Sequence, residues 1–369
     1  MIDVKEIRCS GLSRPMTCSG SLFFENLPKQ PTNAAAEEGT AAGEWLQFLL
    51  ENKNVPVPTH AKNGVYFDDE MKFFTEPIAA EIFKRAKTKP LCETRIDWPT
   101  RSGIWIRGSY DISYVDNDDN LVIEDLKYGY GLVEVKENWQ LLGYAIGEVI
   151  RRQTAFDKII LRIQQPRPHH EEGPTREWVM TYNELLVYKE MIETKMIAIA
   201  GGGVELVTSS KCKYCPAAPE ACTAFNRAAY AGIDFVLNHF QQDHLSEREI
   251  QFQLDLMGRV MDVLKIKDSS LKELAVARIA EGKIIPSYMT EASYGDRKWK
   301  KGVSPKAIEV MTGRKIVEET MLSPAKAEKL GIPKEVINSL VDRHFVGQKL
   351  VRKDANAIGD KIFNNKGAN

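Results

Sequence analysis

The sequence predicts a mixed α/β fold, in which helices flank a β-sheet and a mainly helical region follows. Two β-like runs flank the polar turn at residues 116–120, where Asx residues favour chain reversal. Residues 121–127, 137–151 and 157–164 then read as strand, helix and strand, a crossover that we expect to be right-handed. From about residue 229 onward the pattern changes to helices with clear caps.

Length and composition are those of an ordinary globular protein. The chain has 369 residues, of which 43% are hydrophobic and 27% charged, and we expect two regions, 1–228 and 229–369. No apolar run approaches the length that spans a bilayer and no signal-peptide core is present, so we expect an intracellular protein without membrane contact. The formal net charge of −1 excludes a strongly basic nucleic-acid coat, so any DNA contact must come from local patches.

The N-terminal part has a simple predicted order. Residues 1–35 read as irregular chain. One apolar stripe predicts a helix over 34–51, and we expect a second helix over 65–88 to be interrupted at Pro77. Residues 92–98 read as the first strand.

The elements after the crossover are marked by turn and cap residues. Residues 166–174 form a Pro-rich loop, in which we expect His169 and His170 to be exposed rather than metal ligands. A short strand over 178–182 follows, and Asn183 is the expected cap of the next helix.

The C-terminal region carries two helix-start signals. Ser246-x-x-Glu249 and Ser270-x-x-Glu273 are capping boxes, each of which predicts the beginning of a helix. Gly282 is a good stop for the second of these helices.

Period-2 alternation predicts which side chains of the hairpin share a face. One face of the first run carries Ile104, Ile106, Tyr110 and Ile112, and the other carries Arg107, Ser109, Asp111 and Ser113. In the second run Asp125 and Lys127 share a face, and Glu124 points the opposite way. One hairpin therefore brings Asp111, Asp125 and Lys127 together at a strand end.

Two carboxylates and a lysine are the groups that metal-dependent phosphodiester hydrolysis needs. Hard oxygen ligands hold Mg²⁺, which activates water and offsets developing charge, while an ammonium group positions the nucleophile. The alternative is an exposed hairpin with solvated charges. The apolar run 121–123 and the apolar helix after Glu137 favour a core position instead.

At these residues the chain resembles the PD-(D/E)XK nuclease superfamily, and more closely its RecB-like branch. That branch shows a Gly-x-x-Asp strand, then Asp-x-Lys with a small turn residue, then a helix with Gln-x-x-x-Tyr. The corresponding residues are Gly108-x-x-Asp111, Asp125-Leu126-Lys127, Gly129 and Gln140-x-x-x-Tyr144. Gln140 and Tyr144 lie four apart and share a helix face, where the resemblance implies that they hold substrate phosphate or the lysine.

The resemblance implies a restriction-endonuclease-like sheet and a role for each central residue. Asp111 and Asp125 would ligate Mg²⁺ or Mn²⁺, with the Leu126 carbonyl as a third ligand. Lys127 would orient the attacking water and stabilise the transition state.

One position departs from the RecB-like pattern. The branch carries Gly-Thr-x-x-His on a helix, whose histidine completes the metal site, but this chain has Gly39-Thr40 followed by Gly43 at the histidine position. Glu44 or Glu38 could substitute, the metal could be held more weakly, or catalysis could be lost. An ordinary amphipathic helix with its Glu residues toward water is the remaining alternative.

Three clustered cysteines predict a second metal centre. Cys212-x-x-Cys215 puts two thiolates on one tight turn, and Cys222 can close on the same ion or cluster. Pro216, directly after the second cysteine, favours an iron–sulfur turn, since a zinc ribbon would show a second Cys-x-x-Cys pair. Zinc and unliganded thiols remain the alternatives.

The resemblance supplies the fourth ligand of this centre. In AddB-like and CRISPR-adaptation nucleases, one cysteine before the first helix and three after the core hold a [4Fe–4S] cluster. Cys18 matches that first position, Cys92 is the alternative fourth ligand, and Cys9 is expected to be free. The implied role is a structural staple rather than electron transfer.

The densest basic and aromatic cluster lies near residue 300. It consists of Arg297, Lys298, Trp299 and Lys300. A Trp among cations suits stacking and phosphate contacts with single-stranded DNA, whereas the alternative is a solvated turn with Trp299 in the core. Phage-borne members of the resembled group carry a similar string, here Gly282-Lys283 and Arg297-Lys298-Trp299.

Together these patterns predict a metal-dependent DNA nuclease. We expect an exonuclease of phage replication or recombination, acting on DNA ends in the cytoplasm of a bacterial host, with a phage single-strand annealing protein as a partner by analogy. A catalytically inactive nuclease fold that serves as a DNA-binding or scaffold module is the second hypothesis. A zinc-stapled interaction protein, in which Asp-Leu-Lys is coincidental, is the third.

Overall fold

A computed structural model describes residues 4–25, 27, 34–51, 56–238 and 245–290. The chain divides into a compact unit, Met1–Ser293, and a second unit from Tyr294 onward. The predicted DNA-binding residues, Arg297, Lys298, Trp299 and Lys300, lie outside the described residues. None of the described helices is long and apolar enough to cross a membrane.

The centre of the first unit is a six-stranded mixed sheet. Its strands are β1 (Glu6–Arg8), β2 (Leu91–Pro99), β3 (Trp105–Val115), β4 (Leu121–Leu126), β5 (Lys158–Gln164) and β6 (Thr175–Thr181). β3 pairs antiparallel with β2 and β4 and parallel with β1. β5 runs parallel to β4, and β6 completes the sheet antiparallel to β5.

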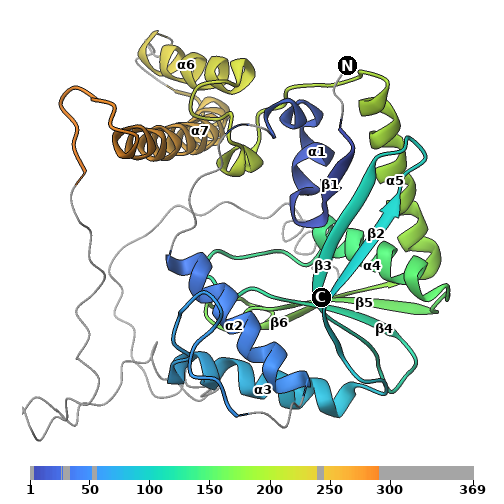
Figure 1. Cartoon of the computed structure of the whole chain (residues 1–369). Helices are drawn as coiled ribbons and strands as arrows, with labels where there is room; N and C mark the ends of the chain where they lie inside the picture. Colours follow the sequence, from blue (N-terminus) through green and yellow to red (C-terminus); the bar gives the residue numbers. More distant parts are fainter. Residues whose placement is uncertain (1–3, 26, 28–33, 52–55, 239–244, 291–369) are drawn as a thin grey trace, which may run out of the picture. The chain divides into compact units, whose positions relative to one another are not determined.

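Helices cover both faces of the sheet (Figure 1). The described helices are α1 (Ser13–Thr17), α2 (Ala34–Glu51), α3 (Asp69–Arg85), α4 (Trp139–Arg152), α5 (Tyr182–Ala200), α6 (Thr223–Asn238) and α7 (Glu247–Ala280), of which α2 to α5 pack on the sheet. On one face, Leu46 of α2 and Ile82 of α3 pack with Val122. On the other, Leu142 of α4 and Ile192 of α5 belong to the largest hydrophobic cluster. The predicted mixed α/β class with a helical C-terminal region is confirmed.

The predicted order of strand, helix and strand is confirmed, with bounds that differ by one or two residues. α4 connects the parallel strands β4 and β5, and its start is fixed by Asn138, whose side chain accepts hydrogen bonds from the N–H groups of Gln140 and Leu141. α2 spans the predicted range, 34–51, because its apolar stripe continues without a break to Leu50.

Two predictions in the N-terminal part were wrong. Residues 1–35 are not all irregular: β1 pairs with β3, and short helical turns follow at Cys9–Gly11, in α1 and at Ser19–Phe24. α3 continues through Pro77, which lies on its exposed side, where water can hydrate the carbonyl that loses its hydrogen bond.

Two cap predictions were also wrong. α5 is capped by Thr181 rather than Asn183, because Thr181 and Glu184 form a reciprocal capping box. The predicted capping box of Ser246 and Glu249 is present at the start of α7. The second predicted capping box is absent, because Ser270 lies inside α7 and its hydroxyl donates a hydrogen bond to the Lys267 carbonyl. Gly282, with a φ of 80°, follows the end of α7 as predicted.

The predicted alternation along β3 breaks near its middle. Tyr110 packs in the cluster below α4, whereas Ile112 packs in the cluster below α2 and α3, although we expected both on one face. The break coincides with Glu93 on the paired strand β2, whose φ of 46° is left-handed. The side chains of both strands therefore change faces next to Asp111.

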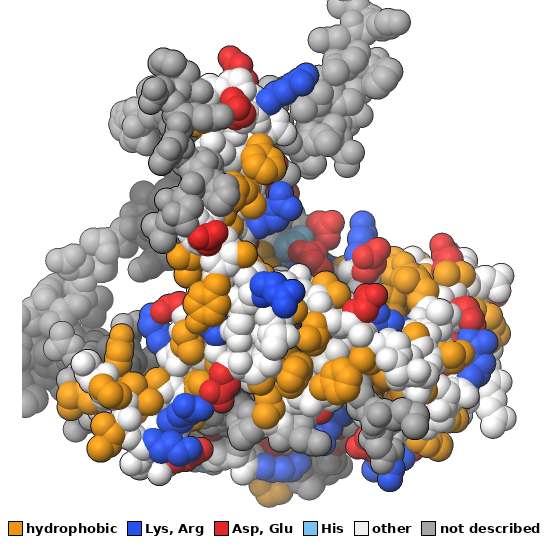
Figure 2. Space-filling model, turned by 90° about the horizontal axis from the view of Figure 1, so that it is seen from above, with side chains coloured by type: hydrophobic (Ala, Val, Ile, Leu, Met, Phe, Trp, Pro, Cys, Tyr) orange, Lys and Arg blue, Asp and Glu red, His pale blue; other side chains and the backbone are white. Residues whose placement is uncertain are grey.

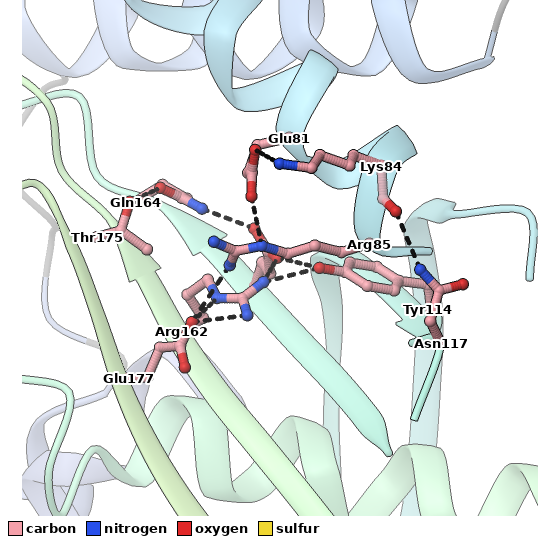
Figure 3. Close-up of polar contacts among 10 residues, drawn as sticks. Glu81, Lys84, Arg85, Tyr114, Asn117, Arg162, Gln164, Thr175 and Glu177 are labelled. Atoms are coloured by element: carbon pink, nitrogen blue, oxygen red, sulfur yellow. Dashed lines mark hydrogen bonds and ion pairs between the residues drawn. The ribbon is translucent and has the colours of Figure 1, made fainter. Parts of the chain in front are cut away.

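A buried polar network holds β4 between its neighbours on the α3 side of the sheet (Figure 3). Glu124 is fully buried and accepts hydrogen bonds from Tyr114 on β3 and from Arg162 and Gln164 on β5. Arg162 also pairs with Glu177 on β6. Glu124 thus points away from Asp125, as predicted, and these cross-strand contacts fix the strand that carries Asp125.

Candidate active site

The carboxylates of the predicted site line one open cavity of about 880 Å³. Asp111 enters it from β3, Asp125 from the end of β4, Lys127 from the residue after β4, and Gln140 from the first turn of α4. The residues that motif spacing assigned to one site are therefore brought together. Tyr144 lies one turn beyond Gln140 and is buried, and its hydroxyl accepts a hydrogen bond of 3.2 Å from Gln140 Nε2.

Hydrogen bonds fix each of these side chains. The N–H of Leu126 donates to Asp111 Oδ2 at 2.8 Å, which ties β3 to the end of β4. Gln140 Nε2 donates to Asp125 Oδ1 at 3.1 Å, and Lys127 Nζ donates to Gln140 Oε1 at 3.2 Å. Gln140 therefore orients both the carboxylate and the lysine.

One buried oxygen of the site is incompletely satisfied. Lys127 Nζ lies 2.6 Å from Asp125 Oδ2, yet this oxygen accepts no hydrogen bond of acceptable angle. The two groups are therefore an ion pair by distance, and the buried Oδ2 accepts no further hydrogen bond. A buried carboxylate oxygen that is paired only with one ammonium group is a suitable ligand for a cation.

The electrostatics of the cavity also favour a cation. Burial, followed by the charge of Asp125, raises the pKa of Asp111 to about 8. Burial acts to lower the pKa of Lys127, but Asp125 and Asp111 outweigh it, so the net shift is upward and Lys127 stays charged. The charge of Asp125 disfavours the ionisation of Asp111, and a bound divalent ion would relieve this repulsion.

Asp111→Asn is expected to stabilise the metal-free protein at pH 8 by about 1–3 kcal/mol. The folded state holds a proton on Asp111 up to a pKa of about 8, and the unfolded chain releases it near pH 4, so wild-type stability falls as pH rises between these values. Asn carries no charge and can still accept from Leu126 N–H. Urea unfolding at pH 5 and pH 8 without divalent ions measures the difference, and a larger loss for the variant than for wild type contradicts this explanation.

Helix α2 borders the cavity through its small residues. A Cβ built on Gly39 or Gly43 meets nothing within 4 Å, so Gly43 leaves open the space that the histidine of the RecB-like pattern would enter. Glu44 lines the cavity and accepts a hydrogen bond from the N–H of Lys62. Glu38 does not line it, because Arg167 engages it through both guanidinium nitrogens.

Sequence reasoning missed the residues that hold the loop after Lys127. Gln165 is buried; its Nε2 donates to the carbonyls of both Gly129 and Gly131. The guanidinium of Arg167 lies 4.0 Å from the ring centre of Tyr128 and 5.1 Å from that of Tyr130. Neither Gln165 nor Arg167 belongs to a recognisable motif. The spacing of Gly129 and Gly131 is the one sequence feature that indicates a flexible loop, which needs contacts from other elements to hold it.

The four predicted cluster cysteines line a second, largely apolar pocket. Cys18 comes from the segment before α2, and Cys212, Cys215 and Cys222 come from the segment between α5 and α6. Three of their sulfurs accept backbone N–H groups: Val207 donates to Cys18, Ser209 to Cys212 and Phe225 to Cys222, at 3.3–3.4 Å. Such hydrogen bonds stabilise thiolates and are typical of iron–sulfur ligands.

The two cysteine-bearing segments also contact each other directly. Gly20 N–H donates to the Glu205 carbonyl at 2.8 Å, and Glu205 N–H donates to Ser19 Oγ at 2.9 Å. A Cβ on Gly20 would lie 2.9 Å from that carbonyl oxygen, so only glycine permits this approach. The pocket therefore sits where two segments distant in sequence are already joined.

The other two cysteines lie elsewhere, and none of the six forms a disulfide. Cys92 is on β2 beside the cluster under α2 and α3, and it does not line the cysteine pocket. Cys9 is fully buried against Gly108 and Gly143, where burial raises its pKa to about 12. Geometry thus favours Cys18 over Cys92 as the partner of the three clustered cysteines.

Across the described ranges, no three or more His, Cys, Asp or Glu side chains are already arranged to hold a metal ion. The carboxylates therefore share one cavity and the cysteines another, but neither set is already arranged as a complete coordination site. His169 is exposed and His170 is half-buried, and neither lines the two cavities described above.

Comparison with known families assigns the chain to one family. Residues 6–356 match the family described as "Protein of unknown function (DUF2800)", which spans nearly the whole chain, so the protein belongs to this family. A solved structure titled "Crystal structure of SSO0001" is similar at 12% sequence identity and a TM-score of 0.31, covering 60% of this chain and 86% of that one. A similarity at that level carries no functional argument.

Proposed function

We propose that this protein is a divalent-metal-dependent deoxyribonuclease of the RecB-like PD-(D/E)XK type. The observation that carries the proposal is the convergence of Asp111, Asp125, Lys127 and Gln140 from three elements in one cavity, in the chain order and spacing of that motif. A chance Asp-x-Lys would not be expected to find a second carboxylate and a bridging glutamine beside it.

The residues suit phosphodiester hydrolysis. Asp111, Asp125 and the Leu126 carbonyl would hold Mg²⁺ or Mn²⁺, which supplies Lewis acidity and a bound water of lowered pKa. Lys127 keeps its proton and presents a positive charge to the cavity, where negative charge develops on the scissile phosphate. Gln140 hydrogen-bonds to both Lys127 and Asp125, so it would hold the ammonium group and the carboxylate in place during the reaction.

The rim of the cavity suits a nucleic acid. Tyr130 is 64% exposed and lies between Gly129 and Gly131, which line the cavity, so its ring is available for a base to stack on. On the face of the molecule that Figure 2 draws, the described Lys and Arg side chains are interspersed with Asp and Glu. DNA would therefore be held by local contacts, as the net charge of −1 requires.

The four cysteines of the second pocket form the structural part of the proposal. Cys18, Cys212, Cys215 and Cys222 would hold a [4Fe–4S] cluster, or Zn²⁺ as the alternative, that fastens the segment before α2 to the segment after α5. We place the nuclease in phage replication or recombination, acting on DNA ends in the bacterial cytoplasm. A phage single-strand annealing protein is the partner that this role suggests.

A cleavage time course on end-labelled linear DNA tests the proposal. Single- and double-stranded DNA are incubated with anaerobically prepared protein in Mg²⁺ or Mn²⁺, beside Asp125→Ala and beside Asp97→Ala, an exposed residue of β2 outside the cavity. We expect metal-dependent degradation by wild type and Asp97→Ala, and none by Asp125→Ala. Equal cleavage by Asp125→Ala would identify a contaminating nuclease and overturn the proposal.

One observation favours a second function, a catalytically inactive nuclease fold that binds DNA as a scaffold. Gly43 contributes no side chain to the cavity where the resembled nucleases place a histidine. DNA binding by metal-replete protein without cleavage supports this second function. Binding of Mn²⁺ at Asp111 and Asp125 argues against it, because an inactive module does not need the ion.

A further inference from the structure

The backbone of β2 is distorted at a residue that faces the candidate site. Glu93 has a φ of 46°, a conformation that L residues other than Asn and Asp seldom adopt. The other non-glycine residues of the described chain with positive φ, such as Asp119 and Gln153, lie in turns or at helix ends, where such angles are common. Glu93 instead lies inside a strand.

The distortion places the Glu93 carboxylate with those of the site. The pairs Cys92↔Ile112 and Thr94↔Tyr110 set Glu93 across from Asp111 in the β2–β3 register. Its side chain lines the same cavity as Asp111 and Asp125. A strand residue with ordinary angles would keep the alternation of β2, so the left-handed angle is the local cause of this placement.

The side chains that line the cavity carry an excess of negative charge, which one divalent cation would neutralise. Its wall carries four carboxylates, from Glu44, Glu93, Asp111 and Asp125, but only two ammonium groups, from Lys62 and Lys127. Two negative charges are thus uncompensated when all six groups are ionised. Independently of this count, the buried Oδ2 of Asp125 accepts no hydrogen bond of acceptable angle, although Lys127 Nζ lies 2.6 Å from it.

We infer that Glu93 is a third carboxylate ligand of the divalent ion, bound directly or through water, and that it takes the place left open by Gly43. This inference rests on the proposed metal site at Asp111 and Asp125. Glu44 is the less suitable candidate, because one of its oxygens already accepts the N–H of Lys62. A strand glutamate in this role explains why the helix can carry glycine where the RecB-like pattern has histidine.

Titration of the full-length protein with Mn²⁺, followed by electron paramagnetic resonance, tests the inference without relying on activity. Glu93→Gln keeps the shape of the side chain and removes its charge, while Asp97→Asn makes the same change four residues along β2, outside the cavity. We expect Glu93→Gln to weaken Mn²⁺ binding at least about tenfold and Asp97→Asn to leave it within about twofold. Wild-type affinity in Glu93→Gln overturns the inference.

Glu93→Gly separates ligation from folding. Glycine adopts a φ of 46° without strain, so the metal-free variant is expected to melt at or above the wild-type temperature while the rise in melting temperature on adding Mn²⁺ becomes smaller. An undiminished rise contradicts ligation by Glu93.

The outcomes also separate this inference from the proposed function. If wild type binds Mn²⁺ and cleaves DNA while both Glu93 variants bind the ion normally, only the role of Glu93 is rejected. If wild type neither binds Mn²⁺ nor cleaves DNA, the proposed function and the inference are rejected together.

Discussion

Lys127→Ala is expected to lower the rate of DNA cleavage by about 10²–10³-fold or more, while the protein remains folded in Mn²⁺. The ammonium group of Lys127 lies 2.6 Å from Asp125 Oδ2 and is held by Gln140, so it is a fixed positive charge beside the two aspartates. It acts on charge that develops in the transition state, and such interactions affect the rate more than binding. Single-turnover cleavage at saturating enzyme measures the effect.

Two controls make the Lys127 result interpretable. Lys136→Ala removes an exposed lysine nine residues further along, outside the cavity, and should cleave at the wild-type rate. Thermal melting in Mn²⁺ establishes that Lys127→Ala is folded, which matters because the substitution leaves the buried Asp125 without its ion pair. Wild-type-like cleavage by folded Lys127→Ala would rule out the proposed role of the lysine.

Cys215→Ser is expected to abolish the broad visible absorbance of anaerobically purified protein and to lower its stability by about 2–5 kcal/mol. The magnitude is that of losing a cross-link over a long loop, since strands β2 to β6 lie between Cys18 and Cys215 in the sequence. Visible spectra, iron and sulfide analysis and urea unfolding measure the two effects.

Cys92→Ser is the matched control for the cluster. Cys92 is also a half-buried thiol, but it lies on β2 away from the cysteine pocket, so its loss should leave the spectrum unchanged. Colourless protein with stoichiometric zinc identifies the alternative metal. If the purified protein is colourless and holds no metal, and Cys215→Ser is as stable as wild type, then the cysteines hold neither an iron–sulfur cluster nor zinc.

The parts of the fold that could be predicted are those whose signals are local and strong. The apolar stripe of α2 and the continuous apolar run of β4, followed by a capped amphipathic helix, determine those elements without help from the rest of the chain. β1 could not be predicted, because a strand of only three residues is stabilised by its parallel partner β3 rather than by its own sequence. Ser270 resembles a cap but lies inside α7, since a capping box starts a helix only where the chain before it is not already helical.

The candidate site was predictable only as far as its motif extends. Asp111, Asp125, Lys127 and Gln140 follow from spacing, because a hairpin and a following helix have few ways to place them. The left-handed angle of Glu93 leaves no sequence signature, as glycine or asparagine would have done. The alternation along β3 was mispredicted for the same reason.

The supporting contacts behind the site were equally invisible in the sequence. Gln165 fixes the loop after Lys127 through two backbone carbonyls, and Arg167 ties it to Glu38 on α2. Such contacts depend on the tertiary arrangement of β5 and α2, which no local pattern encodes.

Binding of one divalent ion by Asp111 and Asp125 is the premise shared by the nuclease proposal and the role of Glu93. Calorimetric titration of metal-free protein with Mn²⁺ at pH 8, for wild type and Asp125→Ala, tests it most directly. We predict about one ion per chain for wild type, with release of protons because the pKa of Asp111 lies near 8, and no such binding for Asp125→Ala. Equal Mn²⁺ binding by the two proteins, or none by either, would contradict a metal site at these carboxylates.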